Sequence, residues 1–243
     1  MKRVLIVGAK SDIGMATALE YAKNGFDLYL ASRNNHELND FANIIRSKTD
    51  KKVTLLELDI LDYKSHYSFY HNLQIKPVGI VSSVGYLGNQ EKAALDFTET
   101  SKIIDTNYTG IVNLLNIISN DFKRQKSGFI VGISSVAGER GKKVNLIYSS
   151  AKAGFTAYLS GLRNDLSQFN IHVMTVIPGY VKTKMIEHLN TSKFLTATPE
   201  AVAKAIYNGQ QNKKNTIYIK WIWKYIMIIV KLIPERIFKN MNI

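Results

Sequence analysis

Cysteine is absent from this 243-residue chain, which excludes disulfides and thiolate metal sites. The five histidines are scattered without a metal-ligating spacing, so we predict no metal. No apolar run is long enough to cross a bilayer, and the run that follows the basic start Met1-Lys2-Arg3 is too short for a signal peptide. These absences favour a metal-free cytoplasmic protein.

Acidic side chains are also scarce: 19 Asp and Glu stand against 32 Lys and Arg, for a formal charge of +13. Such an excess fits a nucleic acid, an anionic lipid or a phosphate-rich cofactor as partner, or simply a basic solvated surface. The sequence contains no zinc finger, KH loop or RNP-type aromatic motif. We therefore expect no nucleic-acid partner.

Short Val, Ile and Leu runs alternate with longer helical stretches, which is typical of a parallel sheet covered by helices on both faces. The predicted strands are residues 3–8, 27–32, 53–58, 78–83, 128–134, 171–177 and 216–219. The predicted helices are residues 13–24, 36–48, 62–73, 91–124, 147–169 and 199–210. This order predicts an α/β fold in one domain, residues 1–219: a Rossmann fold with a doubly wound, seven-stranded parallel sheet that binds nucleotides at the carboxyl ends of its strands.

The turn Gly8-Ala-Lys-Ser-Asp-Ile-Gly14 joins the first strand to the first helix and offers backbone amides and a positive helix end to a pyrophosphate. Its candidate binding residues include Lys10, Ser11 and Ile13. Asp12 stands where a glycine commonly lets the backbone approach the phosphates, so we expect its carboxylate to turn away, with helix capping as one role open to it. A plain strand-to-helix turn is the alternative.

The second strand ends in Ser32-Arg33, without the acidic residue that would hold the ribose 2′-hydroxyl of NAD. A hydroxyl and a guanidinium can instead receive a 2′-phosphate, and Lys10 offers a second positive contact. We therefore predict NADP(H) as the cofactor, unless Arg33 is only a solvent-facing loop charge.

Two further strand ends are candidate cofactor contacts, although each could be a simple strand terminus. Asp59, followed by Ile60, could accept a hydrogen bond from the adenine amino group, and Gly85 would let the backbone pass close to the cofactor. Within the next helical stretch, Asn107 is surrounded by apolar residues at core spacing. A buried amide of this kind needs hydrogen-bond partners.

Tyr148 and Lys152 are separated by four residues, which places both side chains on one face of a helix. A positive charge beside a phenol favours the phenolate form and lowers its pKa. Ser135 ends an apolar run and could reach the same oxygen. On its own, this spacing is more often that of an ordinary surface pair.

Taken together, these residues resemble the short-chain dehydrogenase/reductases in order and spacing over residues 2–219. The resemblance rests on Gly8 to Gly14, Asp59, Gly85, Asn107, Ser135, Tyr148, Lys152, and Pro178-Gly179 followed by Val181 and Thr183. Two departures are Asp12 and the Ser82-Ser-Val-Gly85 stretch, where the family has a glycine and Asn-Asn-Ala-Gly. Homo-oligomers are common in this family, and we expect one here.

The resemblance also implies a role for each catalytic residue. Tyr148 would exchange a proton with a carbonyl oxygen that Ser135 holds, and Lys152 would grip the nicotinamide ribose and lower the tyrosine pKa. Asn107 would support a water that relays protons to Lys152. The loop from Pro178 to Thr183 would cover the nicotinamide, with binding residues Pro178, Gly179, Val181 and Thr183.

A basic and aromatic tail, residues 220–243, follows the seventh predicted strand. Lys220, Lys224 and Lys231 fall in one arc of a helix that Pro234 would break, and Ile222, Ile226, Ile229, Val230 and Ile233 cover the far side. Trp221, Trp223 and Tyr225 suit the lipid headgroup boundary. We predict a helix lying on the inner face of the cell membrane; packing on the domain or at a dimer interface is the alternative.

Substrate contacts are expected from residues 85–90, from residues 139–147 and from a lid that ends near Thr198. The loop Glu139-Arg140-Gly-Lys142-Lys143, with Asn145, is basic enough for a sugar or phosphate, or is a solvated loop. Loop and tail loosely resemble a subgroup that includes the decaprenylphosphoryl-2-ketoribose reductases. This implies NADPH-dependent reduction of a lipid-linked or cell-envelope ketosugar; the alternatives are a 3-oxoacyl or lipid ketone reductase and a non-catalytic nucleotide- or membrane-binding module.

Overall fold

A computed structural model describes residues 2–187 and 190–241 of the chain. Its centre is a parallel seven-stranded sheet with strand order β3-β2-β1-β4-β5-β6-β9. The strands are β1 (Arg3–Val7), β2 (Asp27–Ser32), β3 (Val53–Glu57), β4 (Gly79–Ser82), β5 (Gly128–Ile133), β6 (Ile171–Pro178) and β9 (Thr216–Ile219). The seven predicted strands and the doubly wound fold are thus confirmed.

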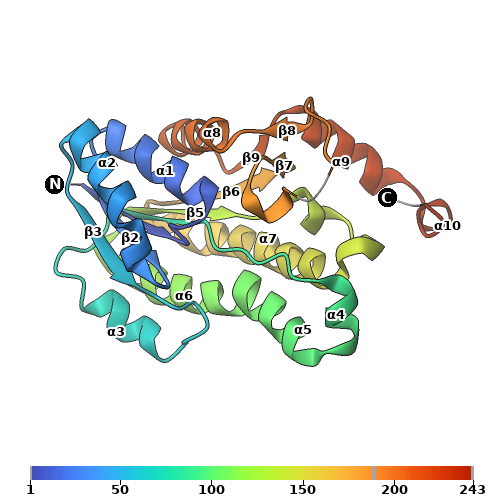
Figure 1. The fold of residues 1–243 in the computed structure, drawn as a ribbon, viewed down its shortest axis with the longest axis horizontal. Coiled ribbons are helices and arrows are strands. Elements are labelled where there is room, and N and C mark those ends of the chain that lie inside the picture. Colours follow the sequence, from blue (N-terminus) through green and yellow to red (C-terminus); the bar gives the residue numbers. More distant parts are fainter. Residues whose placement is uncertain (1, 188–189, 242–243) are drawn as a thin grey trace.

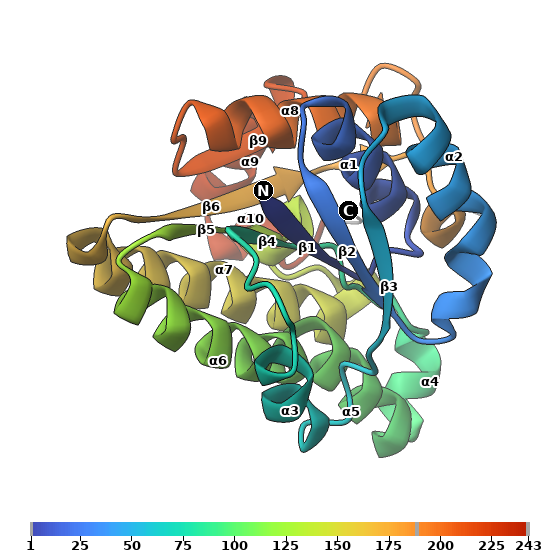
Figure 2. The same ribbon diagram turned by 90° about the vertical axis from the view of Figure 1, so that its left-hand side faces the viewer.

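Helices cover both faces of this sheet (Figures 1 and 2). One face carries α1 (Asp12–Lys23), α2 (Asn39–Thr49) and α8 (Pro199–Gln211); the other carries α3 (Ser65–His71), α6 (Gly110–Gln125) and α7 (Leu146–Leu166). Successive side chains of a strand point to opposite faces, so Val4 and Ile6 join one apolar cluster and Leu5 and Val7 join the other. Apolar strands buried on both faces therefore account for the two-sided core.

The single helix expected over residues 91–124 is wrong. The chain forms α4 (Gln90–Leu95), α5 (Phe97–Ile104), a π-helical turn (Asp105–Thr109) and then α6. Asp96 separates α4 from α5 because its backbone is extended and its carboxylate accepts a hydrogen bond from the Thr98 amide at 2.8 Å. No glycine or proline marks this break in the sequence.

Two other predicted helices differ at their starts. The expected helix at 62–73 begins only at Ser65, and the one at 36–48 opens with a 3-10 turn, Asn35–Leu38, before α2. After β6, a small second sheet pairs β7 (Tyr180–Val181) with β8 (Thr196–Ala197), which the sequence did not predict. The connection between these strands is the expected lid; its residues 188–189 lie outside the described ones.

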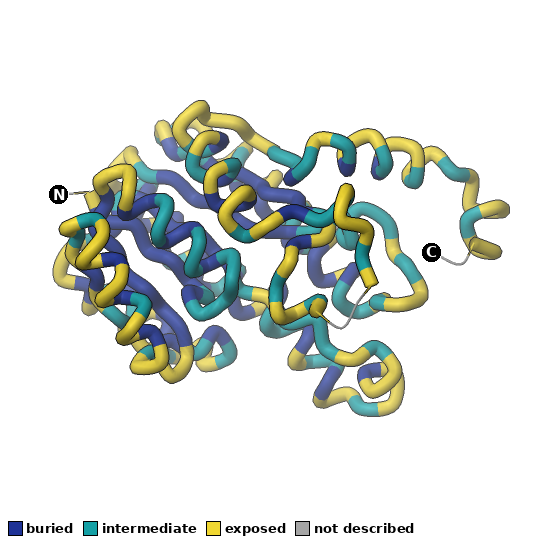
Figure 3. The backbone as a smooth tube through the Cα atoms, turned by 45° about the horizontal axis from the view of Figure 1, so that its top comes forward, coloured by how far each residue is buried: buried dark blue, intermediate teal, exposed yellow. Residues whose placement is uncertain are grey.

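The tail forms α9 (Ile222–Leu232) and α10 (Glu235–Phe238), separated at Pro234 as expected. Trp223 and Met227 of α9 are buried against the rest of the protein, while much of the helix is exposed (Figure 3). Lys220 precedes the helix in a left-handed conformation, φ 57°, so the expected arc of three helical lysines is wrong. Among the described residues, no helix has both the length and the apolar character needed to cross a membrane.

Candidate active site

A cavity of about 580 Å³ opens at the carboxyl ends of the central strands. It joins the glycine turn, the strand end after β5 and the face of α7, which are distant in the sequence. Twelve of the predicted site residues line it: Lys10, Ser11, Asp12, Ile13, Gly85, Ser135, Tyr148, Lys152, Pro178, Gly179, Val181 and Thr183.

The glycine turn has a geometry that larger residues would prevent. Gly8 has a positive φ of 77°, and a β-carbon there would lie 2.7 Å from the carbonyl oxygen of Ser83. A β-carbon on Gly14 would lie 2.5 Å from the carbonyl oxygen of Gly8. Both glycines therefore shape the turn, and the start of α1 lines the cavity through Asp12 and Ile13.

Ser11, and not Asp12, caps α1. Its hydroxyl accepts a hydrogen bond from the Gly14 amide at 3.0 Å and lies 2.7 Å from the Ser83 hydroxyl. The Asp12 carboxylate instead accepts a hydrogen bond from the backbone amide of Lys184 at 2.9 Å. The capping role considered for Asp12 is therefore wrong, and this residue ties the glycine turn to the loop beyond Thr183.

Tyr148 and Lys152 lie on one face of α7, with the lysine ammonium 5.8 Å from the centre of the tyrosine ring. Lys152 is 3% exposed and donates to the carbonyl oxygen of Ile133 at 3.1 Å. Ser135 follows β5, its hydroxyl accepts a hydrogen bond from the Ala137 amide at 3.1 Å, and it lines the same cavity as Tyr148. The structure thus brings the three predicted catalytic side chains together.

Burial controls the protonation of this group. It raises the pKa of Tyr148 to about 12, although the nearby Ser135 hydroxyl opposes the shift. Burial also lowers the pKa of Lys152 to about 8, because the surrounding protein disfavours its charge. The shift of the Tyr148 pKa thus runs opposite to the one expected from Lys152, whose role towards the tyrosine stays a prediction.

Asn107 lies in the π-helical turn and is almost fully buried. Its amide nitrogen donates to the carbonyl oxygens of Tyr86 at 2.6 Å and Ile103 at 2.8 Å, and its oxygen accepts from the Tyr86 amide at 3.2 Å. A β-carbon on Gly85 would lie 3.6 Å from the Asn107 oxygen and 3.8 Å from the Lys152 nitrogen. Asn107 and Lys152 therefore flank Gly85, as the proposed proton relay requires.

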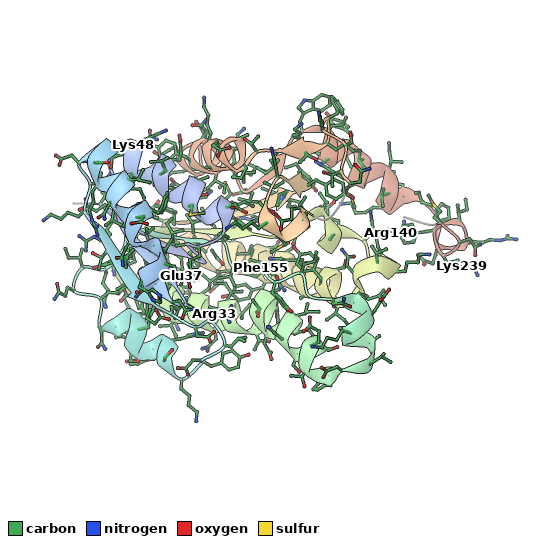
Figure 4. All side chains as sticks on the ribbon, viewed as in Figure 1. Arg33, Glu37, Lys48, Arg140, Phe155 and Lys239 are labelled. Atoms are coloured by element: carbon green, nitrogen blue, oxygen red, sulfur yellow. The ribbon has the colours of Figure 1, made fainter. Side chains whose placement is uncertain are left out.

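The strand ends predicted to hold the adenosine lie beside the cavity and do not line it. Arg33 is exposed after β2 (Figure 4). The Asp59 carboxylate accepts a hydrogen bond from the Leu61 amide at 3.0 Å, and Ile60 is buried against Gly110. Glu57 fixes the turn after Arg33 by accepting two backbone amides. Among the residues that the structure describes, none forms a hydrogen bond or ion pair with the exposed Arg33 guanidinium.

Lys10 is paired, which the sequence did not indicate. Its ammonium lies 2.6 Å from a carboxylate oxygen of Glu37, and this contact holds the pKa of Glu37 below its ordinary value. Beside them, the Ser32 hydroxyl is buried without a hydrogen-bond partner among the described residues. The Ser32 hydroxyl and Arg33 could hold the 2′-phosphate of NADP(H), and the glycine turn with the N-terminus of α1 could hold its pyrophosphate. For Lys10 to contact the 2′-phosphate as well, its ammonium would have to leave Glu37.

Trp223 is a cavity residue that sequence reasoning missed. Its ring packs against Gly179, where a β-carbon would overlap it, and its indole N–H donates to the Leu195 carbonyl oxygen at 3.0 Å. The expected position of Trp223 at a lipid headgroup boundary is therefore wrong. The other wall residues from outside the expected segments include Ser83, Val84, Ile133, Ser134, Val136 and Ala137.

The expected substrate loop divides into two parts. Lys142, Val144 and Asn145 line the cavity, whereas Glu139 and Arg140 do not. Arg140 donates to the carbonyl oxygens of Val230 and Ile233 at 2.5 and 2.7 Å, and Glu139 lies 3.3 Å from the Lys231 ammonium. Glu139 and Arg140 thus hold the tail, and their expected place facing substrate is wrong.

Comparisons with known proteins identify the family. A family model described as short chain dehydrogenase matches residues 2–193. The chain belongs to the short-chain dehydrogenase family.

Relatives of this short-chain dehydrogenase extend over its whole length. An uncharacterized oxidoreductase of Mycobacterium tuberculosis is 32% identical, covering 98% of this chain and 96% of that protein. The ketoacyl reductase HetN of Nostoc is 26% identical over 90% of this chain and 78% of its own. A short-chain dehydrogenase from Sphingobium yanoikuyae, solved in complex with NADPH, has the same fold, with TM-score 0.83, 21% identity and coverage of 100% and 97%.

Proposed function

We propose that this oxidoreductase uses NADPH to reduce a carbonyl group to an alcohol. One observation carries the proposal: a single cavity joins the glycine turn of a dinucleotide fold to Ser135, Tyr148 and Lys152. When bound, the cofactor supplies the hydride. The chain supplies the proton and the grip on the carbonyl oxygen.

The protonation states favour the reducing direction. With a pKa of about 12, Tyr148 carries its proton at neutral pH and can donate it to an oxygen that gains negative charge. Ser135 lines the same cavity as Tyr148 and would hold the substrate oxygen beside the phenol. Lys152, with a pKa of about 8, can return a proton at neutral pH, and its position beside Asn107 suits resupply from solvent.

The deciding experiment follows NADPH oxidation with a panel of ketosugar polyprenyl phosphates, 3-oxoacyl thioesters and small ketones. Tyr148→Phe keeps the ring and removes the proton donor, so we expect kcat to fall by about 10²- to 10⁴-fold. Tyr158→Phe, which alters a tyrosine of α7 paired with Asn116, is the matched control. A Tyr148→Phe protein with wild-type turnover would sink the assignment.

NADP(H) is proposed over NAD(H) because Arg33 is a free guanidinium beside the unpartnered Ser32 hydroxyl. Arg33→Ala should weaken NADPH binding by about 10- to 150-fold, since hydrogen bonds to a charged group contribute about 1.5 to 3 kcal/mol. NADH binding should change little. Equal losses for both cofactors in a fluorescence titration would exclude a 2′-phosphate contact at Arg33.

For the substrate, we propose a ketosugar linked to a lipid. The cavity wall combines Lys142 and Asn145, which suit hydroxyls or a phosphate, with the apolar Val144, Met185 and Trp223, which suit a chain. A 3-oxoacyl ketone is the second candidate, because the same apolar wall suits an acyl chain and HetN, a relative, is named a ketoacyl reductase. Turnover restricted to oxoacyl thioesters would favour it.

The intact set of Ser135, Tyr148, Lys152 and Asn107 argues against a module that only binds a nucleotide or a membrane. A protein that binds NADPH without turning over any carbonyl in the panel would reverse this judgement. Self-association also remains a proposal, which light scattering on the purified protein would test.

A further inference from the structure

The outward side of the tail is an apolar stripe that the fold does not cover. Trp221, Tyr225, Ile229 and Leu232 succeed one another at helical spacing, and each is more than half exposed, with Leu232 at 75%. The rings of Trp221 and Tyr225 meet edge to face with centres 5.7 Å apart. We call these four residues the outer stripe. It is opposite the side of α9 that carries the buried Trp223 and Met227.

Positive charge flanks the outer stripe. Residues 220–241 contain five basic side chains and one acidic side chain, which gives a net charge of +4. The single acid, Glu235, pairs with Arg140 at 2.9 Å, so it is already compensated by the body of the protein. Lys224, Arg236 and Lys239 are exposed, and Lys239 points away from the protein at the tip of the tail (Figure 4). An anionic partner fits this distribution.

The geometry of the tail favours a surface over a second copy of the chain. Two copies meeting through this face would bring like charges together, in a protein whose formal charge is +13. A helix of 11 residues spans only about 16 Å, too short to cross a bilayer but sufficient to lie in its interface. Aromatic rings beside lysines are what a headgroup boundary accommodates.

The helix also connects this surface to the cavity. Trp223, on the inward side of α9, forms part of the cavity wall, and its ring lies 5.5 Å from that of Tyr180. Tyr180, Met185 and Val144 line the cavity and are themselves exposed, so an apolar rim extends from the mouth towards the tail. Through Trp223, the helix that carries the outer stripe is therefore also part of the cavity wall.

We propose that the outer stripe docks this protein on an anionic lipid surface, which brings the cavity mouth to the lipid that carries its substrate. The docking itself stands on the exposed stripe and its charges, whereas the delivery of substrate rests on the proposed function. The two can therefore fail separately.

The test is cosedimentation of the full chain with vesicles of phosphatidylcholine, alone or mixed with phosphatidylglycerol. We expect binding to the mixed vesicles that weakens as salt rises. The variant Trp221→Ser/Tyr225→Ser/Leu232→Ser should bind them at least about 100-fold more weakly, since three large side chains lose their apolar contact with lipid.

The matched control is a triple variant at exposed apolar residues away from the tail, in α2, α3 and the turn after α3. This variant, Ile44→Ser/Tyr67→Ser/Ile75→Ser, should bind the mixed vesicles as the wild type does. Equal binding by both triple variants, or no preference for phosphatidylglycerol, would overturn the proposal. So would a wild type that ignores vesicles and forms dimers that the tail variant loses, because the stripe would then join two copies.

NADPH oxidation with a small soluble ketone separates docking from catalysis. The tail variant should retain this activity, because the outer stripe contributes no residue to the cavity. Activity on a lipid-linked substrate in mixed vesicles should fall with the loss of binding. Vesicle binding without any reductase activity would contradict the proposed function and leave the docking intact.

Discussion

Arg140→Met should loosen the tail while every predicted catalytic residue stays in place. The Arg140 side chain is only 14% exposed, and its guanidinium donates to the carbonyl oxygens of Val230 and Ile233 at the end of α9. The guanidinium carbon Cζ also lies 3.7 Å from the centre of the Phe238 ring. Methionine keeps much of the apolar length but removes every donor, so the last carbonyls of α9 lose their protein partner.

The size of the effect follows from these contacts. A cation at a partly buried helix C-terminus contributes up to about 2 kcal/mol, and hydrogen bonds from a charged donor contribute about 1.5 to 3 kcal/mol. Both figures describe the same contacts and are not added. The ion pair with Glu235 is discounted, because that side chain is 77% exposed. We expect docking of α9 to weaken by about 2 to 3 kcal/mol, or about 30- to 150-fold.

Hydrogen exchange of the amides in residues 222–232 measures this directly, since the exchange rate rises with the population of the opened helix. Arg124→Met is the matched control, because Arg124 pairs with Asp121 within α6 at 2.9 Å and makes no contact with the tail. Its α9 amides should exchange at the wild-type rate.

The reasoning would be refuted by unchanged exchange in α9 together with a large change in kcat/KM. Arg140 would then act on the substrate, as the basic loop suggested from sequence alone. A rise in exchange accompanied by a rise in KM is the expected pattern, because Trp223 of α9 forms part of the cavity wall.

Three further outcomes are expected. Gly179→Ala should push the Trp223 ring out of the cavity wall and lower the free energy of unfolding by about 1 to 3 kcal/mol. In a Trp221→Phe background, where Trp223 is the remaining tryptophan, the fluorescence emission should shift; an unshifted spectrum would contradict the packing. Lys152→Met should stabilise the protein at pH 7, because it removes a buried positive charge. The folded protein releases the Lys152 proton near pH 8 and the unfolded chain near pH 10.5, so the gain in the free energy of unfolding should shrink between these values in denaturant titrations. Asp12→Ala should speed exchange at the Lys184 amide by roughly fivefold, with an unchanged rate as the contrary result.

Strands and catalytic side chains were accessible from the sequence because their signals are local. An apolar run such as residues 128–133 is buried on both faces wherever it lies in a parallel sheet, so its composition predicts a strand. The four-residue separation of Tyr148 and Lys152 fixes a shared helix face regardless of the remaining fold. The roles predicted for Ser135 and Asn107 came instead from the order and spacing that they share with the short-chain dehydrogenases.

The break at Asp96 and the protonation of the site were decided by the fold. An aspartate is compatible with a helix, and only the extended backbone at Asp96 turns it into the cap of α5. Likewise, spacing alone places a positive charge near Tyr148, whereas the depth of burial sets both pKa values. Desolvation depends on everything packed around a group and leaves no mark in its own sequence neighbourhood.

The sequence by itself determined the parallel sheet, the glycine turn and the choice of Ser135, Tyr148 and Lys152 as candidate catalytic residues. Tertiary structure alone decided what Arg140 and Trp223 do. Arg140 binds carbonyl oxygens some 90 positions further along the chain, and the Asp12 carboxylate binds an amide 172 positions away. Such partners are backbone atoms, which every residue possesses, so only their positions in space reveal them.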